Sequence, residues 1–228
     1  MRRAQNESSR GANDAPRTLK EDPLHGSERV REYFADAYPA VLAFTEHLAD
    51  QGVLRGLIGP RELTRMWERH ILNSAALAPF LPSGVLVDVG SGAGLPGMVL
   101  AAMQPDRHVV LIEPMERRTI WLLEAARSAG LANVSVVRGR AQEVSASVEA
   151  DVITARAVAS IDKLVKWCEP LLSATGQMVF LKGRSAPEEL ESAKYVLRNH
   201  GLVGQVLRAD TLAGIEATTV VRLQRQAS

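Results

Sequence analysis

Glycines follow an apolar run in the stretch "VLVDVGSGAGLPGMVLA", residues 85–101. The run ends near Asp88, and Gly90, Gly92 and Gly94 form a GxGxG pattern directly after it. A strand that turns through glycines into a helix lets a ligand approach the backbone closely, because glycine has no Cβ. Loops of this kind hold nucleotides, so the stretch predicts a nucleotide-binding site.

Two acidic residues indicate which nucleotide the loop favours. Glu113 closes the next apolar run, "VVLIEP", about 20 residues after the loop, where a carboxylate can accept hydrogen bonds from a ribose diol. We expect Asp88 to lie near the ligand's amino group, where a carboxylate disfavours a pyrophosphate and favours a sulfonium with an ammonium tail. This favours S-adenosylmethionine over NAD. A shifted register, Gly92, Gly94 and Gly97, also satisfies GxGxxG, so an NAD oxidoreductase stays open.

The elements that would position this loop alternate along the chain. Apolar runs predict strands at residues 84–90, 108–114, 133–139, 150–156 and 176–183, and helical patterns lie between them. Two late strands, 202–209 and 218–225, could pair as a hairpin after a helix at 187–201. Such alternation predicts an α/β fold with a mostly parallel sheet, covered on both faces and carrying an antiparallel edge.

The chain before the sheet is predicted to be helical. Residues 1–27 are polar and predict a disordered tail, residues 28–82 an N-terminal helical extension, and residues 83–228 the ligand-binding domain. Within the extension, Pro39 marks a kink or a junction, and residues 59–81 predict one helix with Pro60 in its first turn. In the helices of the binding domain, Trp121 and Trp167 lie in apolar patterns, so both are expected in the core.

Composition limits the functional classes. The 228 residues suit one α/β domain with additions, and 46% hydrophobic with 23% charged residues is typical of a globular protein. The net charge is +1, so a nucleic-acid surface would need local clusters of Lys and Arg. Cys168 is the single cysteine, which argues against disulfides and a cysteine-rich metal site and fits the cytoplasm. We expect no metal, no secretory signal and no membrane span.

An ordered set of motifs narrows the class. "WERHILNSA", "DVGSGAGLPG", "RGRAQEV", "ARAVASIDKLVKW" and "LKG" together resemble the ribosomal RNA small subunit methyltransferase G family, also called glucose-inhibited division protein B. The resemblance runs from about residue 28 to residue 225. It implies a Rossmann-like class I methyltransferase with a seven-stranded sheet. It also implies N7 methylation of one guanosine in the 530 loop of 16S rRNA, and low-level streptomycin resistance when the enzyme is lost.

The resemblance carries site residues over one by one. It implies cofactor contacts from the loop and from the pair that flanks the adenine: Gly90, Gly92, Gly94, Leu95, Ala141 and Gln142. It implies that Arg156 reaches the cofactor and the target, that His70 faces the same cleft, and that Lys182 ends the fifth strand. All three would position rather than react, and Lys182 is expected to contact RNA phosphate. This chain departs from the family at Gln142, often acidic, and at Ala155, often serine.

The implied chemistry needs little from the protein. Guanine N7 carries a lone pair and no proton, so no base has to remove one and no catalytic dyad is expected. Cys168 lies in mid-helix and is expected to be a small buried hydrophobe, not a nucleophile. The expected partner is 16S rRNA or the 30S subunit, bound by a monomer. A small-molecule methyltransferase and a non-catalytic S-adenosylmethionine-binding ribosome assembly factor remain alternatives.

Overall fold

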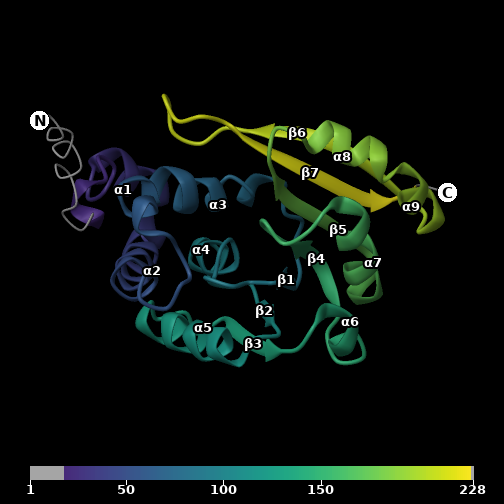
Figure 1. Ribbon diagram of the computed structural model, residues 1–228, viewed down its shortest axis with the longest axis horizontal. Coiled ribbons are helices and arrows are strands. Elements are labelled where there is room, and N and C mark those ends of the chain that lie inside the picture. Colours follow the sequence, from purple (N-terminus) through teal and green to yellow (C-terminus); the bar gives the residue numbers. More distant parts are fainter. Residues whose placement is uncertain (1–17, 227–228) are drawn as a thin grey trace, which may run out of the picture.

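The alternating strands and helices form one sheet of seven strands in the order β3-β2-β1-β4-β5-β7-β6 (Figure 1). The structure, a computed structural model, describes residues 18–226. The first five strands run parallel, β7 is antiparallel to β5, and β6 pairs with β7 as the predicted hairpin. The strands are β1 (Leu86–Val89), β2 (Val109–Glu113), β3 (Val134–Arg138), β4 (Ala150–Thr154), β5 (Leu172–Lys182), β6 (Leu202–Ala209) and β7 (Thr218–Arg225). The predicted α/β fold is confirmed.

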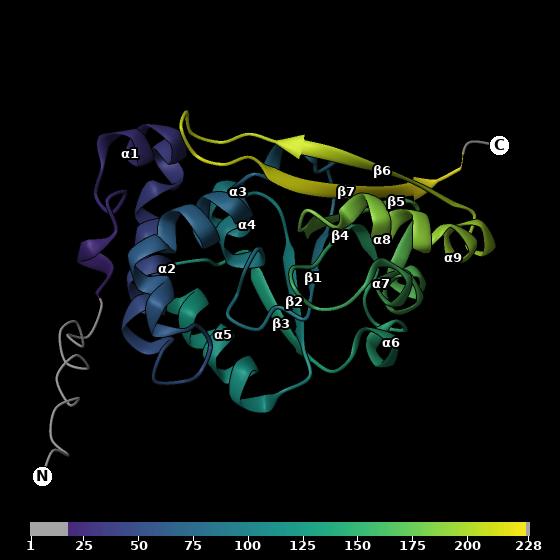
Figure 2. The same cartoon turned by 45° about the horizontal axis from the view of Figure 1, so that its top comes forward.

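Helices cover both faces of the sheet (Figures 1 and 2). Leu86 and Leu111 belong to one apolar cluster while Val87 and Ile112 belong to the other, as the side-chain alternation of a strand requires. The first cluster is completed by α2 (Tyr38–Gln51), α4 (Gly97–Met103) and α5 (Glu116–Ser128). The second is completed by α6 (Ala141–Val144), α7 (Ile161–Cys168), α8 (Ala186–Ser192) and α9 (Lys194–Asn199). The N-terminal extension therefore shares a core with the sheet.

The extension contains a change of helix type that the sequence did not reveal. The junction at Pro39 is confirmed: α1 (Glu28–Phe34) ends before it, and Pro39 lies in the first turn of α2. The single helix predicted at 59–81 is instead a 3₁₀ segment, a π-helical turn and a short α-helix, namely η3 (Pro60–Arg65), η4 (Trp67–Leu72) and α3 (Asn73–Ala75). A π-turn redirects the side chains that it carries, and such turns are frequent at functional sites.

The segment before α1 corrects the predicted tail. Leu19 is buried, and Asp22 is 3% exposed. One carboxylate oxygen of Asp22 accepts the backbone N–H of Trp67 at 2.9 Å, and the other accepts that of Leu24 at 2.9 Å. The start of the π-turn thereby gains a partner for an N–H that the helix cannot satisfy. The prediction of disorder is wrong for residues 18–27, and residues 1–17 lie outside the described residues.

The strand register brings the predicted site residues to one edge. Asp88 lies beside Leu111 of β2 and Thr154 of β4, so these three parallel strands end at the same level. The glycine loop and Arg156 follow the ends of β1 and β4, and Glu113 is the last residue of β2. The carboxyl edge of such a sheet is where ligands bind.

Candidate active site

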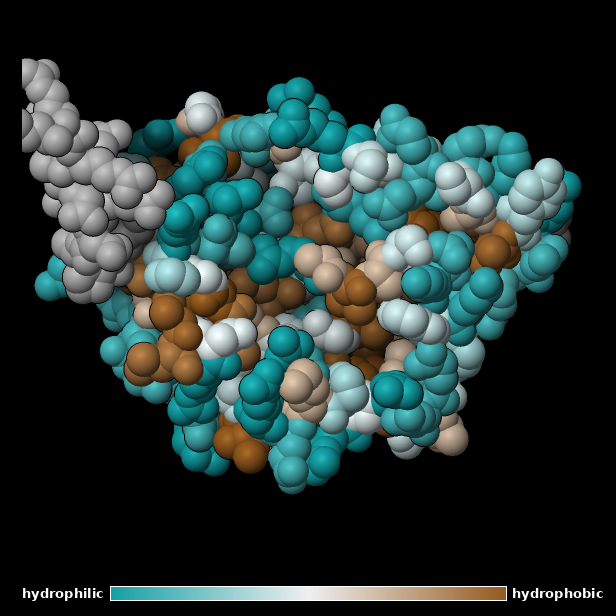
Figure 3. All heavy atoms as spheres, viewed as in Figure 1, coloured by the Kyte–Doolittle hydropathy of each residue, from teal (hydrophilic) through white to brown (hydrophobic). Residues whose placement is uncertain are grey.

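A cleft of about 730 Å³ opens at the carboxyl edge of the sheet. Its walls come from the loop after β1, the end of β2, the start of α6 and the loop after β4. In Figure 3, apolar residues gather in a recess at the middle of the face and hydrophilic residues surround it. Among the residues that line the cleft are Gly90, Gly92, Leu95, Glu113, Ala141, Gln142, Arg156 and Trp167. Most of the predicted cofactor residues therefore meet in one place.

The glycine loop has two kinds of glycine. Gly92 lines the cleft with φ +53°, and a Cβ there would have no heavy atom closer than 3.7 Å, so its space is open. Gly90 also lines the cleft, with φ +71°, and a Cβ there would lie 2.9 Å from Val158. Gly94 does not line the cleft, because its Cβ position is filled by Met98. Gly90 and Gly92 thus shape the cleft, and Gly94 lets the loop pack against a helix.

Glu113 ties the loop to the second strand. Its side chain is 2% exposed, and its carboxylate accepts the N–H of Gly92 at 3.0 Å and that of Met115 at 2.9 Å. The guanidinium of Arg118 lies 3.9 Å from the same carboxylate and also borders the cleft. A carboxylate keeps lone pairs beyond these bonds, so Glu113 can still accept a ribose hydroxyl.

Asp88 is not among the residues that line the cleft, contrary to the expectation that it faces the ligand's amino group. It is fully buried, and its carboxylate accepts the N–H of Gly97 at 3.1 Å. The reason is strand alternation, which turns Asp88 to the same face as Leu86, where α4 begins. Burial raises the pKa of Asp88 to about 7. Asp88 therefore stabilises the start of α4, which follows the glycine loop, and does not contact the cleft.

The far wall of the cleft contains an aromatic residue that sequence patterning placed in the core. Ala141 and Gln142 begin α6 and line the cleft as expected, and Trp167 of α7 lines it with them. Trp67 and Trp121 are fully buried, whereas Trp167 is only partly buried. The apolar periodicity of α7 could not separate a residue that faces the core from one at its border with a cleft.

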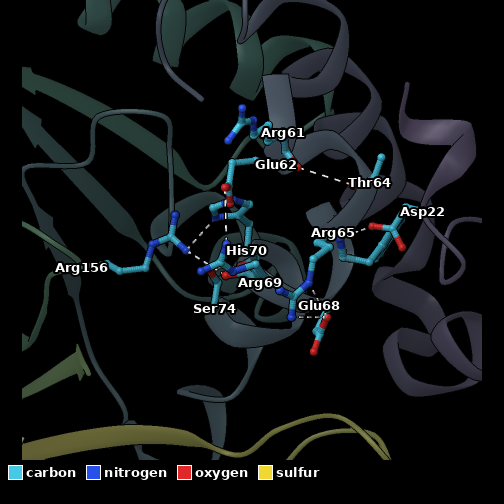
Figure 4. A network of polar contacts seen from close by, with 11 residues as sticks. Asp22, Arg61, Glu62, Thr64, Arg65, Glu68, Arg69, His70, Ser74 and Arg156 are labelled. Carbon is cyan, nitrogen blue, oxygen red and sulfur yellow. Dashed lines mark hydrogen bonds and ion pairs between the residues drawn. The ribbon is translucent and has the colours of Figure 1, made fainter. Parts of the chain in front are cut away.

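Arg156 joins the cleft to the N-terminal extension (Figure 4). It follows β4, and the next residue, Ala157, has φ +54°, an uncommon conformation for a residue with a Cβ. The guanidinium donates to Nδ1 of His70 at 3.1 Å. His70 is not among the residues that line the cleft, contrary to the expectation that it faces it, and it meets the site only through its contact with Arg156.

Lys182 is engaged elsewhere. Its ammonium donates to the carbonyl of Ala159 and to Glu189, both at 2.7 Å, and its side chain is 9% exposed. It does not line the cleft. A lysine that is buried and paired in this way is not free for an RNA phosphate, so that expectation is corrected. Lys182 instead fixes the loop that follows Arg156, because Ala159 belongs to that loop.

No cysteine or histidine is among the described residues that line the cleft. Cys168 is fully buried, and burial raises the pKa of its thiol to about 12, which confirms it as a core residue. No metal-binding group of three or more His, Cys, Asp or Glu occurs within residues 18–226. The arrangement can bind and orient a ligand, but it presents no activated nucleophile.

The strand order with its antiparallel β7 and the glycine cleft define a class I S-adenosylmethionine-dependent methyltransferase. Solved structures agree on the fold. An S-adenosylmethionine-dependent methyltransferase from Aquifex aeolicus is 16% identical with a TM-score of 0.53, and the match covers 71% of this chain and 93% of that one. Fibrillarin from Aeropyrum pernix with natively bound S-adenosyl-L-methionine is 18% identical with a TM-score of 0.52, covering 68% and 75%.

Sequence relatives identify the family. The family profile "GidB: rRNA small subunit methyltransferase G" matches residues 38–211. Proteins named ribosomal RNA small subunit methyltransferase G from Thermobifida fusca and Leifsonia xyli subsp. xyli are 48% and 52% identical to this chain. These matches cover 86% and 71% of this chain, and 84% and 78% of the relatives. The chain belongs to the rRNA small subunit methyltransferase G family.

Proposed function

We propose that this protein transfers the methyl group of S-adenosylmethionine to N7 of one guanosine in the 530 loop of 16S rRNA. The observation that carries the proposal is the cleft in which Arg156 meets the glycine loop and Glu113, with no histidine or cysteine among the described lining residues. Guanine N7 offers a lone pair without a proton, so a site of this kind is sufficient. Methylation at a carbon or a proton-bearing nitrogen would need a nucleophile or a base.

The lining residues fit the cofactor. The open space at Gly92 leaves room for a ligand against the backbone, and Glu113 has acceptor capacity for the ribose diol. We assign the adenine to Ala141 and Gln142, where the amide oxygen of Gln142 can accept from the exocyclic amine. We assign the cofactor carboxylate to Arg156, whose planar guanidinium suits it. The bound cofactor supplies an electrophilic methyl group on sulfur.

The protein's contribution to the reaction is orientation. The lone pair of N7 must lie in line with the sulfur–methyl bond, and holding two reactants in that geometry removes much of the barrier. Because N7 carries no proton, none has to leave the base, and no residue of the cleft is needed as a proton acceptor. His70 and Lys182 act indirectly in this scheme, because one holds Arg156 and the other holds the loop after it.

Two exposed arginines near the contact between His70 and Arg156 suit the RNA backbone. Arg65 ends η3 and Arg69 lies in η4, with side chains 53% and 51% exposed, and they pair at the surface with Glu68 and Glu62 respectively. Exposed arginines there can contact phosphates and fix the position of the RNA without reading its sequence. We propose 16S rRNA or the 30S subunit as the partner and a monomer as the active form.

We place the reaction in the cytoplasm, where ribosomal subunits are present. Within residues 18–226, no helix is both long enough and apolar enough to cross a bilayer.

The test uses S-adenosylmethionine with a labelled methyl group and 30S subunits from a strain that lacks the modification. We expect label in 16S rRNA with the unaltered protein, and a loss of at least about 100-fold in rate with Arg156→Ala, as misplaced reactants produce. Circular dichroism would establish that the variant is folded. Turnover of a small molecule without RNA, or 30S binding without transfer, would replace the proposal by one of the two alternatives. Normal transfer by Arg156→Ala would remove Arg156 from the site.

A further inference from the structure

Arg156 is held from one side by the π-helical turn η4 (Figure 4). Its Nη1 donates to Nδ1 of His70 at 3.1 Å and to the carbonyl of Arg69 at 3.3 Å. Within the described residues, its Nε and Nη2 make no hydrogen bond. One edge of the planar guanidinium is therefore fixed, and the remaining N–H groups are available to the cleft that Arg156 lines.

The contact with Arg156 fixes the tautomer of His70. A guanidinium only donates, so Nδ1 of His70 must accept and the proton of the neutral ring lies on Nε2. Nε2 lies 2.8 Å from Oε2 of Glu62 and donates to it. Burial first, and then the charge of Arg156, lowers the pKa of His70 to about 4. The ring is therefore neutral at physiological pH and connects an anion to a cation.

Glu62 completes the series from outside the cleft. Its second carboxylate oxygen accepts from Arg69 at 3.4 Å, and its side chain is 28% exposed. It is not among the residues that line the cleft. Three charged groups surround the His70 ring. They are Glu62 of η3, Arg69 of η4, which also carries His70, and Arg156 of the loop after β4. A carboxylate that accepts from one ring nitrogen orients the ring and fixes what the other nitrogen presents.

We propose that Glu62 is a positioning residue for methyl transfer: through the His70 ring, it sets the direction in which Arg156 presents its free N–H groups to the cofactor. The inference rests on the proposed function, since Arg156 must contact the cofactor for its direction to matter. Glu62 does not line the cleft, so its position alone would not predict this role. The series Glu62–His70–Arg156 does, because each contact requires the next one to have a defined donor and acceptor.

The test measures the dissociation constant of S-adenosylmethionine by calorimetry, so that it does not depend on the RNA target. The variants are Glu62→Ala, Glu62→Gln, Arg156→Ala and the double variant Glu62→Ala with Arg156→Ala. Glu68→Ala is the matched control, because Glu68 lies on the same segment, is 29% exposed and pairs with Arg65 rather than with His70. Melting temperatures are recorded for all of them.

We expect Glu62→Ala to weaken binding about tenfold, which is about 1.4 kcal/mol, and Glu68→Ala to have an effect below about twofold. Glu62→Gln should recover most of the affinity, because its amide oxygen still accepts from His70. In the Arg156→Ala background, Glu62→Ala should have no further effect, since residues that act through one another are not additive. Equal effects of Glu62→Ala and Glu68→Ala, or additive effects in the double variant, would overturn the inference. Unchanged affinity in Arg156→Ala would overturn the cofactor site itself.

Discussion

Replacing Gly92 by alanine separates the role of the glycine loop in folding from its role in binding. A Cβ at Gly92 would have no atom closer than 3.7 Å in the protein, so nothing in the fold blocks it. The residue lines the cleft, so the added methyl group occupies the space where the cofactor would meet the backbone. The substitution should therefore have a small effect on the stability of the protein and a large effect on its affinity for the ligand.

The size of the folding effect follows from the backbone. Gly92 has φ +53°, and the left-handed conformation costs a residue with a Cβ roughly 1–2 kcal/mol. For a chain of 228 residues, 1 kcal/mol lowers the melting temperature by roughly 2–4 °C. The dissociation constant for S-adenosylmethionine should rise at least tenfold, about 1.4 kcal/mol, because the ligand must withdraw from the backbone or move it.

Gly97→Ala is the contrasting variant. Its Cβ would lie 2.8 Å from the carboxylate of Asp88 and would also meet Leu111, so the core must shift and stability should fall by about 1–3 kcal/mol. Calorimetric titration gives the dissociation constant of each variant for S-adenosylmethionine, and thermal melting gives its loss of stability. The prediction is wrong if Gly92→Ala binds S-adenosylmethionine as tightly as the unaltered protein, or if it loses well over about 2 kcal/mol of stability.

Three further outcomes are expected. Binding of S-adenosylmethionine should change the tryptophan fluorescence, and Trp167→Phe should remove most of the change, since Trp167 lines the cleft whereas Trp67 and Trp121 are fully buried and Trp121 reaches the glycine loop only through the carbonyl of Ala93; an unchanged signal in the variant would place Trp167 away from the ligand. Lys182→Met should lower the unfolding free energy by about 2 kcal/mol, because Ala159 and Glu189 lose a buried partner; an unchanged melting temperature with weaker 30S binding would restore the RNA-contact role. The pKa of His70 falls from 6.5 in the unfolded chain to about 4, so the unfolded state takes up a proton first as the pH falls. This contribution of His70 should be lost between pH 6.5 and 4, by at most about 3 kcal/mol, while the raised pKa of Asp88, about 7, acts in the opposite direction over the same range. Denaturant titrations should therefore show that the stability of the unaltered protein relative to His70→Asn falls as the pH falls; a constant difference would contradict the lowered pKa of His70.

The sheet and the cleft were predictable because their signals are local. An apolar run before glycines and an acid at the end of the next run place Gly92 and Glu113 at one sheet edge, whatever surrounds them. The antiparallel hairpin of β6 and β7 was predictable for the same reason, because two apolar runs follow each other without a helical pattern between them. These features depend on periodicity, which the sequence displays directly.

Other features depended on tertiary partners. Asp22 lies in a polar segment, and its buried role appears only when Trp67 of the π-turn needs an acceptor. Glu62 and His70 are eight positions apart, and the 3₁₀ and π segments between them alter the spacing that an α-helix would give. Asp88 is a different case: applying side-chain alternation from Leu86 would have turned it toward α4 rather than toward the ligand.

The position of the methyl group on the RNA decides whether N7 of a guanosine in the 530 loop is the target. The protein would be incubated with S-adenosylmethionine and 30S subunits from a strain that lacks the modification, and the extracted 16S rRNA treated with borohydride and aniline, which cleave at 7-methylguanosine. We predict one cut, at a guanosine of the 530 loop, that depends on the cofactor. Methyl label in the RNA without that cut would contradict N7 as the target, and a cut outside the 530 loop would contradict the proposed site.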